Sequence, residues 1–231
     1  MAGNVTFGVR LPNSGPFATR DALLDVARAA DHLGFDAIWV HDHIPWSREK
    51  RTHFAAGSIE AVGDQDPNFF ESLSTLAYLG GMAPRLRLGV AGLVVPLRDP
   101  RVLAKQAATL HEMSGGRLIL AIGIGAIPND FEIMGVPFHR RGKITDEYLR
   151  AMLALFSEAP EVTFQGQRVQ FASGEFYPKP RHLPIWIAGM SEAAYRRMAW
   201  AGSGWLPVYL SPEEYGAQAE QMHRVLREAG R

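Results

Sequence analysis

The sequence predicts an α/β fold in which a parallel sheet is built from repeated strand–helix units. Six short, nearly continuous apolar runs alternate with longer segments whose apolar residues recur at helical spacing. Such runs are typical of parallel strands that are buried on both faces. No Gly-x-Gly-x-x-Gly motif follows the first run, where a dinucleotide-binding, doubly wound fold usually carries one. The sequence therefore favours a TIM (β/α)8-type barrel over a doubly wound sheet.

The expected strands are the six apolar, β-branched runs. They lie at residues 5–11, 36–40, 86–95, 117–125, 183–190 and 204–210. Between them, helical spacing predicts helices at residues 19–34, 69–83, 99–113, 143–157, 191–201 and 212–229. Thr19, Asp99 and Ser191 are residue types that cap helix N-termini, and Gly34 is typical of a helix end. The alternation of strands and helices implies right-handed crossovers and one parallel sheet.

The number of units is smaller than a closed barrel requires. A complete barrel has eight βα units in about 250 residues, whereas 231 residues here contain six recognisable units. We interpret residues 1–231 as a single barrel domain that is incomplete. Three explanations stay open: a naturally incomplete barrel, a C-terminally truncated sequence, or an edge that another chain covers.

Two insertions interrupt the regular alternation. Residues 44–68 are long for a βα loop, which usually has about 2–6 residues, and the insertion is either an active-site lid or a surface loop. Residues 160–182 contain VTFQGQRVQF, where apolar and polar residues alternate on both sides of a glycine. This second insertion is expected to form a β-hairpin.

Composition excludes several classes of protein. Lys+Arg and Asp+Glu both count 24, so the net charge is zero, which argues against general binding of nucleic acid or of a membrane surface. The absence of cysteine excludes disulfides, thiolate metal sites and thiol nucleophiles, and fits a cytoplasmic location. No signal peptide is recognisable, and no apolar run approaches the roughly 18 residues that span a bilayer.

Three polar residues follow the second expected strand. His41, Asp42 and His43 lie at its carboxyl end, the edge where barrel enzymes place their active sites. Histidine suits acid/base catalysis because it titrates near neutral pH. A His-x-His metal site is the alternative, but the other strand ends add no ligand, and nothing in the spacing recommends Asp130. A purely structural polar strand end is the third interpretation, and no metal is expected.

Glycines mark three further strand ends or strand interiors. Gly189, Met190 and Ser191 join the fifth expected strand to a helix, whose N-terminal N–H groups suit an anion such as phosphate. Gly123 and Gly125 end the fourth expected strand, where they either leave room for a flat ligand or simply form a turn. Gly92 lies inside a buried strand, which suggests a bulge or a close ligand contact.

Several long stretches are similar to a known family. The chain resembles the bacterial luciferase-like monooxygenase superfamily, and within it the branch that depends on coenzyme F420, a deazaflavin. The resemblance covers residues 7–208 and lies in LGFDAIWVHDHI, ESLSTLAYLGGMAPRLRLGVAGLVVPLRDPRVLAKQAATLHEMSGGRLILAIGIG, EIMGVPFHRRGKITDEYLRAM and LPIWIAGMSEAAYRRMAWAGSGWLPV. The family fold is a (β/α)8 barrel, so the resemblance implies the barrel and two βα units that this sequence lacks.

The resemblance also implies roles for individual residues. The family's Asp-His pair falls on Asp42 and His43, which makes His43 the expected acid/base or substrate-orienting residue and His41 a secondary candidate. A strand bulge that supports the back of the cofactor ring falls on Ala91, Gly92 and Leu93, and in several members it contains a non-proline cis peptide bond.

The family's phosphate-binding turn falls on Gly189, Met190 and Ser191. The sugar-phosphate dehydrogenases of the family have an acidic residue directly after the Gly-x-Gly of the fourth strand. Ala126 stands there, which argues against that activity unless Asp130 substitutes.

The expected function is that of an F420-dependent oxidoreductase. It would transfer a hydride between the deazaflavin and a small organic substrate, and the family expectation for assembly is a homodimer. An FMN-dependent monooxygenase is the first alternative, since both cofactors use the same ring and phosphate sites. A non-catalytic flavin- or deazaflavin-binding protein, or an inactive fragment, is the second.

Overall fold

The computed structural model describes residues 5–44 and 68–231. Its main element is a curled parallel sheet of six strands, in the order β1-β2-β3-β4-β7-β8. The strands are β1 (Gly8–Arg10), β2 (Ala37–His41), β3 (Arg87–Val94), β4 (Leu118–Gly123), β7 (Ile185–Ala188) and β8 (Gly204–Leu206). Each strand pairs with the sheet strand before it in the chain, without the reversal of order that defines a doubly wound fold. The predicted α/β barrel type is confirmed, and the described strands form half of a barrel.

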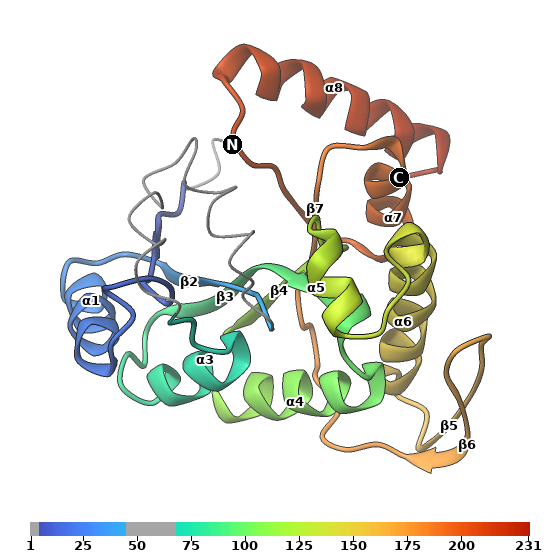
Figure 1. Cartoon of the computed structure of the whole chain (residues 1–231), viewed down its shortest axis with the longest axis horizontal. Coiled ribbons are helices and arrows are strands. Elements are labelled where there is room, and N and C mark those ends of the chain that lie inside the picture. The colour runs from blue at the N-terminus through green and yellow to red at the C-terminus, as the bar shows by residue number, and fades with distance from the viewer. Residues whose placement is uncertain (1–4, 45–67) are drawn as a thin grey trace.

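Helices surround the outer side of this half-barrel (Figure 1). They are α1 (Arg20–His32), α3 (Ser72–Gly80), α4 (Pro100–Met113), α6 (Arg141–Phe156), α7 (Glu192–Ala201) and α8 (Pro212–Glu228). The three N-caps that the sequence predicts are present: the side chains of Thr19, Asp99 and Ser191 accept hydrogen bonds from the first turns of α1, α4 and α7. All six predicted helices form, and α1, α4 and α7 begin at the capping residues that the sequence predicts.

The apolar core lies between the sheet and these helices. All six residues of β4 are buried, as expected for a central strand covered on both faces. On the sheet, Trp39 fits against glycines of its two neighbours, because a Cβ at Gly8 or Gly89 would lie 2.4 or 2.2 Å from the indole. Trp186 stands 5.3 Å from Trp39, measured between ring centroids. The two rings fill part of the concave side of the sheet.

The two edge strands are shorter than predicted. Strands were expected at residues 5–11 and 204–210, but β1 and β8 each contain three residues. Each edge strand has one neighbour within the described sheet, so fewer ladder hydrogen bonds hold its ends. The flanking Phe7 and Val208 are 65% and 47% exposed.

Strand β3 contains the bulge that Gly92 suggests. The register of β3 against β4 shifts between Val90 and Leu93, and Gly92 has a φ of +80°. The left-handed conformation there lets the chain insert an extra residue without a Cβ clash. The bulge is confirmed, but the non-proline cis bond of some relatives is not: among the described residues, the cis peptide is Tyr177–Pro178.

Where the structure describes the segments between strands, they contain a second sheet and a helix that was not predicted. An antiparallel hairpin joins β5 (Glu161–Gln165) and β6 (Gln170–Glu175) within the second insertion. Helix α5 (Pro128–Ile133) and 3-10 helices at Val95–Leu97 and Phe138–Arg140 were not predicted, because elements this short show no periodicity. Most of the first insertion, proposed above as a lid, lies outside the described residues.

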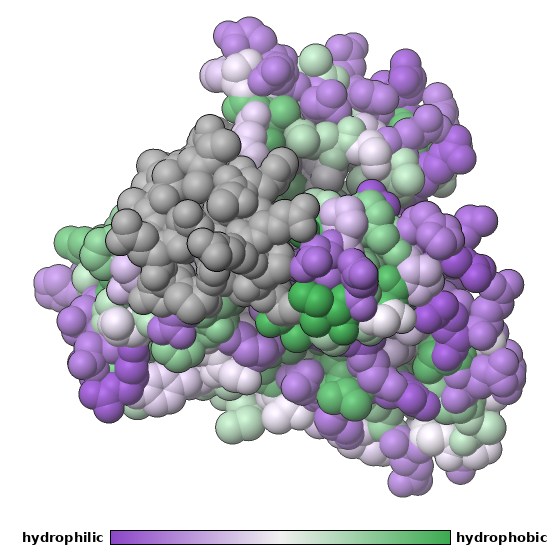
Figure 2. Space-filling view, viewed as in Figure 1, coloured by the Kyte–Doolittle hydropathy of each residue, from purple (hydrophilic) through white to green (hydrophobic). Residues whose placement is uncertain are grey.

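Helix α5 lies in the centre of Figure 1, apart from the outer helices. In the same view, Figure 2 shows hydrophobic surface around this position, where Ile133 and Met134 are 58% and 37% exposed. Hydrophilic side chains cover most of α8 in this view. Helix α5 thus buries Phe131 while Ile133, at its C-terminal end, is exposed.

Candidate active site

The end of β2 is fixed by an asparagine from the segment after β1. The backbone N–H of His41 donates to Oδ1 of Asn13 (3.1 Å), and Nδ2 of Asn13 donates to the carbonyl oxygens of His41 (2.9 Å) and Phe70 (3.2 Å). Asn13 is buried, with 1% of its surface exposed. These bonds hold the end of β2 close to the start of α3, so the residues that follow His41 leave the sheet in a defined direction.

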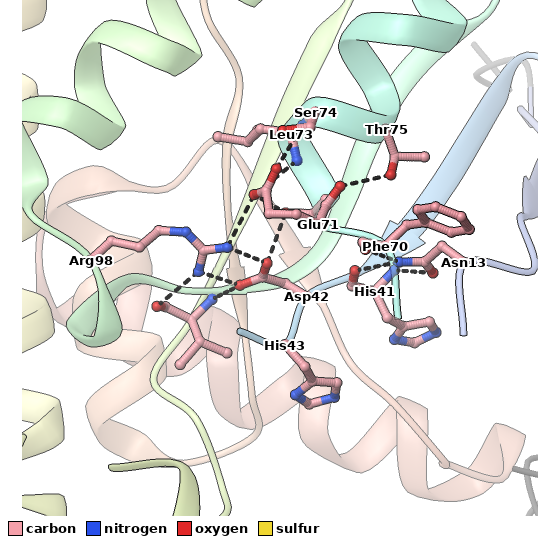
Figure 3. A network of polar contacts seen from close by, with 12 residues as sticks. Asn13, His41, Asp42, His43, Phe70, Glu71, Leu73, Ser74, Thr75 and Arg98 are labelled. Carbon is pink, nitrogen blue, oxygen red and sulfur yellow. Dashed lines mark hydrogen bonds and ion pairs between the residues drawn. The ribbon is translucent and has the colours of Figure 1, made fainter. Parts of the chain in front are cut away.

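Asp42 is the centre of a buried ionic cluster, which we call the Asp42–Arg98 cluster (Asp42, Glu71, Ser72 and Arg98; Figure 3). Arg98 donates to both oxygens of Asp42, at 2.6 and 2.7 Å. Ser72 Oγ donates to Oδ1 (2.7 Å), and the backbone N–H of Val94 donates to Oδ2 (2.8 Å). Asp42 is 2% exposed. Both carboxylate oxygens are therefore engaged in joining β2 to the segment after β3 and to α3.

Glu71 connects this cluster to helix α3. Its carboxylate caps the helix by accepting from the backbone N–H groups of Leu73 (3.2 Å) and Ser74 (2.7 Å), and it lies 3.3 Å from Arg98. Burial alone would raise the pKa of Glu71, but these hydrogen bonds and the Arg98 charge outweigh it, so the pKa is lowered. Glu71 is therefore held in its charged form as part of the cluster.

His43 faces away from the Asp42–Arg98 cluster. Figure 3 shows its ring on the opposite side of the chain from the Asp42 carboxylate. Nδ1 of His43 lies 3.9 Å from Oδ2 of Asp130, and the two side chains are 19% and 6% exposed. The ring of Phe69 contacts the imidazole edge to face, with centroids 5.1 Å apart. The ring of His43 thus lies at the carboxyl edge of the sheet, between Asp130 and Phe69 and outside the Asp42–Arg98 cluster.

The bulge of β3 lies beside these residues. His41 pairs with Ala91, and the Asp42 carboxylate binds the N–H of Val94, so the bulge lies level with the end of β2. Among the described residues, a Cβ added to Gly92 would meet nothing within 4 Å, whereas one added to Gly123 would lie 2.8 Å from the Gly92 carbonyl oxygen. Glycine at Gly123 therefore leaves room for the bulge itself, and the bulge presents bare backbone to open space.

Two further glycines shape the neighbouring strand ends. At Gly125, where φ is +78°, a Cβ would lie 2.7 Å from the ring of Phe131 in α5. At Gly189, where φ is +114°, the turn is fixed by Trp205, whose Nε1 donates to the Gly189 carbonyl oxygen (2.8 Å). Ser191 then caps α7 by accepting from the N–H of Ala194 (3.3 Å). Gly125 thus makes room for α5, and the turn before α7 is held by β8.

The residues that the sequence singles out all lie at the carboxyl ends of β2, β3, β4 and β7. For His41, His43 and the glycine positions, binding or catalytic roles remain predictions. The enclosure of Asp42 favours a supporting role over direct catalysis. No group of three or more His, Asp or Glu residues that could hold a metal ion is found in residues 5–44 and 68–231.

Sequence reasoning did not single out Asp130, Arg98 or Phe69 as site residues. Asp130 was considered only as a distant metal ligand or a substitute acid, because no pattern placed it near His43. Arg98 precedes the recognised Asp99–Pro100 helix start, and it lies 56 residues from its partner Asp42. The feature that identifies these residues is the pairing of buried charges. Charges so far apart in the sequence can be recognised as partners only in the folded structure, where the strands are adjacent.

Relatives were found among curated proteins. The chain is 31% identical over 211 residues to an uncharacterized protein of Mycobacterium tuberculosis (strain ATCC 25618 / H37Rv), which covers 90% of this chain and 72% of the relative. It is 28% identical over 214 residues to a phthiodiolone/phenolphthiodiolone dimycocerosates ketoreductase of Mycobacterium tuberculosis (strain ATCC 25177 / H37Ra), covering 88% of this chain and 55% of the ketoreductase.

Solved structures with the same fold are longer than this chain. An F420-dependent secondary alcohol dehydrogenase in complex with an F420–acetone adduct superposes with a TM-score of 0.81 at 22% identity, covering 99% of this chain and 66% of the dehydrogenase. A long-chain alkane monooxygenase gives 0.80 at 16% identity, covering 100% of this chain and 62% of the monooxygenase. This chain thus spans about two thirds of their length. At these identities the likeness shows the fold alone.

Within the described part of the chain, no helix combines the length and apolar character that crossing a membrane requires.

The family follows from the sequence itself. The sequence profile of the luciferase-like monooxygenases matches residues 5–231, nearly the whole chain. Together with the six-stranded half-barrel and the 31% identical relative, this match shows that the chain belongs to the luciferase-like monooxygenase family, whose members are oxidoreductases.

Proposed function

We propose that this chain carries the active site of an oxidoreductase that depends on coenzyme F420 and transfers a hydride to or from a small organic substrate. One observation carries the proposal. The ring of His43 lies at the carboxyl edge of the sheet, level with a β3 bulge that presents the bare backbone of Gly92 to open space. A flat cofactor ring can lie against backbone only where no side chain intervenes.

The residues at this edge fit the two ends of a deazaflavin or flavin. Ala91, Gly92 and Leu93 would support the ring, and the glycines at the end of β4 (Gly123 and Gly125) leave space for the bulge and for α5. Gly189, Met190 and Ser191 would hold the phosphate, because the N–H groups at the start of α7 and the helix dipole favour an anion. The fixed turn at Gly189 keeps these N–H groups in one orientation.

The protein's own contribution is orientation and proton transfer. When bound, the deazaflavin would supply the two-electron hydride chemistry. Nε2 of His43 would accept the hydroxyl proton as an alcohol loses a hydride from its carbon, and in reverse it would return that proton to the carbonyl oxygen. His41 is a secondary candidate for substrate contact. Asp42 would act through its ion pair with Arg98, by fixing the backbone on which His43 stands.

An FMN-dependent monooxygenase is the second candidate function. The long-chain alkane monooxygenase and an FMN-bound type II Baeyer–Villiger monooxygenase (TM-score 0.76, 16% identity) share this fold. The bare backbone at Gly92 suits either ring. The ketoreductase relative and the alcohol dehydrogenase fold favour hydride transfer between alcohols and ketones, so we rank coenzyme F420 first.

Absorbance of coenzyme F420 provides the test. The purified chain is mixed with the oxidised coenzyme and a panel of secondary alcohols, and with the reduced coenzyme and the matching ketones. The proposal expects substrate-dependent change in absorbance that His43→Gln lowers about 10²–10⁴-fold, the usual contribution of a general acid/base. Oxygen consumption with reduced FMN, and no reaction with coenzyme F420, would instead establish the second candidate.

Two further properties are part of the proposal. We expect a cytoplasmic protein, in keeping with a sequence that contains no cysteine. We also expect a homodimer, as is usual for the family. Light scattering during size-exclusion chromatography checks the second expectation, since it would report twice the chain mass of 25.5 kDa.

A further inference from the structure

Helix α5 buries the carboxylate of Asp130 and exposes the apolar side chain of Ile133. Asp130 is 4% exposed, whereas Ile133, three residues later, is 58% exposed. A surface helix normally does the reverse. Burying a carboxylate costs free energy unless charge or hydrogen bonds compensate for it. The orientation of α5 is therefore set by something that outweighs this cost.

The next residue of the helix supplies the anchor. Phe131 is 1% exposed and belongs to a small apolar cluster with Val94 and Leu97. Phe138 packs against this cluster, with its ring centroid 5.2 Å from that of Phe131. Gly125 permits this packing, because a Cβ there would lie 2.7 Å from the Phe131 ring. The anchor fixes α5 to the end of β3, next to Val94, whose N–H binds Asp42.

The anchored helix places its carboxylate against His43. Oδ2 of Asp130 lies 3.9 Å from Nδ1 of His43, and both side chains are largely buried, so solvent screens the interaction weakly. The charged groups on the other side of His43 are Asp42, Glu71 and Arg98, which bind one another and point away from the ring (Figure 3). Within the described residues, Asp130 is thus the carboxylate that acts on His43.

We infer that Asp130 is the positioning residue of His43: its buried carboxylate, 3.9 Å from Nδ1, sets the orientation of the imidazole ring relative to α5. A carboxylate at this distance also favours the protonated imidazole, because opposite charges stabilise each other. The inference deepens the proposed function and rests on it in one respect, namely that His43 transfers a proton to or from substrate.

The pairing also points to a class of substrate. A histidine supported by a carboxylate is suited to a substrate oxygen that gains or loses a proton during the reaction, as in the interconversion of a secondary alcohol and a ketone. Ala126 stands where the sugar-phosphate dehydrogenases of the family have an acidic residue, so in this chain Asp130, four residues later, provides the carboxylate near the histidine. Asp130 would affect the substrate indirectly, because it orients the ring of His43.

Histidine NMR tests the inference without any substrate. The chain contains eight histidines, so ring-labelled samples are titrated with pH, and His43→Gln identifies the His43 signal. In Asp130→Asn the titration midpoint of His43 should move about 1 pH unit lower, since the opposite charge is lost. Glu132→Gln is the matched control, because it removes the neighbouring exposed carboxylate of the same helix and should leave the midpoint unchanged.

The outcomes separate the inference from the proposed function. An unchanged midpoint in Asp130→Asn, or equal shifts in both variants, would overturn the inference. If Asp130→Asn does not fold, the neutral ring of the wild type decides: a proton on Nδ1 supports the pairing, and a proton on Nε2 contradicts it. Absence of turnover with coenzyme F420 would count against the proposed function alone, because the titration needs no cofactor.

Discussion

Two half-buried arginines hold opposite ends of the sheet, and they do so with different partners. Arg98, at the carboxyl end, binds the carboxylates of Asp42 and Glu71. Arg117, just before β4 at the amino end, donates to backbone carbonyls, at Gly80 and Leu86 (2.6 Å each) and Ser114 (2.7 Å). Burial lowers the pKa of Arg117, but a guanidinium stays charged at neutral pH.

The difference separates a structural end from a functional end. Carbonyl groups are fixed dipoles, so Arg117 joins helix ends and strand starts without bringing another titratable group into the core. At the carboxyl end, Arg98 pairs with Asp42 and Glu71, and His43 lies close to Asp130. Barrel enzymes place their chemistry at the carboxyl end, and of the two arginines Arg98, at that end, is the one paired with titratable groups.

The largest expected effect on stability comes from the ionic cluster. Asp42→Asn leaves Arg98 with the partly exposed Glu71 as its remaining charge partner, and breaking a buried pair costs about 3–5 kcal/mol. Urea unfolding followed by circular dichroism measures the loss. Asp21→Asn, in an exposed pair with Arg20, is the control and should change nothing measurable. A loss in Asp42→Asn as small as in the control would show that the cluster does not hold the carboxyl end.

Removing the amino-end arginine should cost less and affect only stability. Arg117→Met keeps most of the apolar stem but loses the hydrogen bonds to the carbonyls, and we expect a loss of about 2–3 kcal/mol. Affinity for coenzyme F420, extrapolated to fully folded protein, should stay within twofold of the wild type. A specific loss of affinity would mean that the two ends are not independent.

Two helix N-caps, Ser191 and Thr19, compare the carboxyl end with the rest of the fold through smaller effects. Ser191→Ala and Thr19→Ala each remove an N-cap, and each should cost about 1 kcal/mol in thermal or urea unfolding. Only Ser191 lies at the proposed phosphate turn, so only its variant should bind FMN more weakly while binding riboflavin, which lacks the phosphate, unchanged. Equal losses for the two ligands would argue against a phosphate at this turn.

The smallest expected effect depends on pH. Because the folded-state pKa of Glu71 is lowered, its charge stabilises the fold above the ordinary Glu value, and this contribution is lost as the pH falls through the lowered value. The stability difference between wild type and Glu71→Gln should therefore be largest at neutral pH and should shrink below about pH 4.3. A difference that grows in acid would contradict the assignment of Glu71 as a charged cap.

Local sequence patterns predicted the elements but not the long-range pairs. Continuous apolar runs located the strands, and Gly92 inside one of them predicted the bulge, since only a special backbone conformation explains a glycine there. The edge strands and α5 were mispredicted because pairing on one side and a length of six residues leave weak patterns. The contacts of Asp42 with Arg98 and of His43 with Asp130 depend on the sheet curling, which no local pattern encodes.

The most direct test of the account uses two glycines of equal geometry. Gly92 and Gly34 both have a φ of +80°, and a Cβ at either would meet no described residue within 4 Å. Alanine at either position should therefore cause similar strain. Tryptophan fluorescence of the wild type, Gly92→Ala and Gly34→Ala is titrated with coenzyme F420 and, separately, with FMN.

The account predicts saturable quenching by coenzyme F420 in the wild type and in Gly34→Ala. In Gly92→Ala the dissociation constant should rise at least about tenfold, because the new methyl group projects into the space proposed for the ring and about 1.4 kcal/mol of lost contact suffices for that factor. Equal affinity in all three proteins, or quenching by FMN alone, would contradict a deazaflavin site at the β3 bulge.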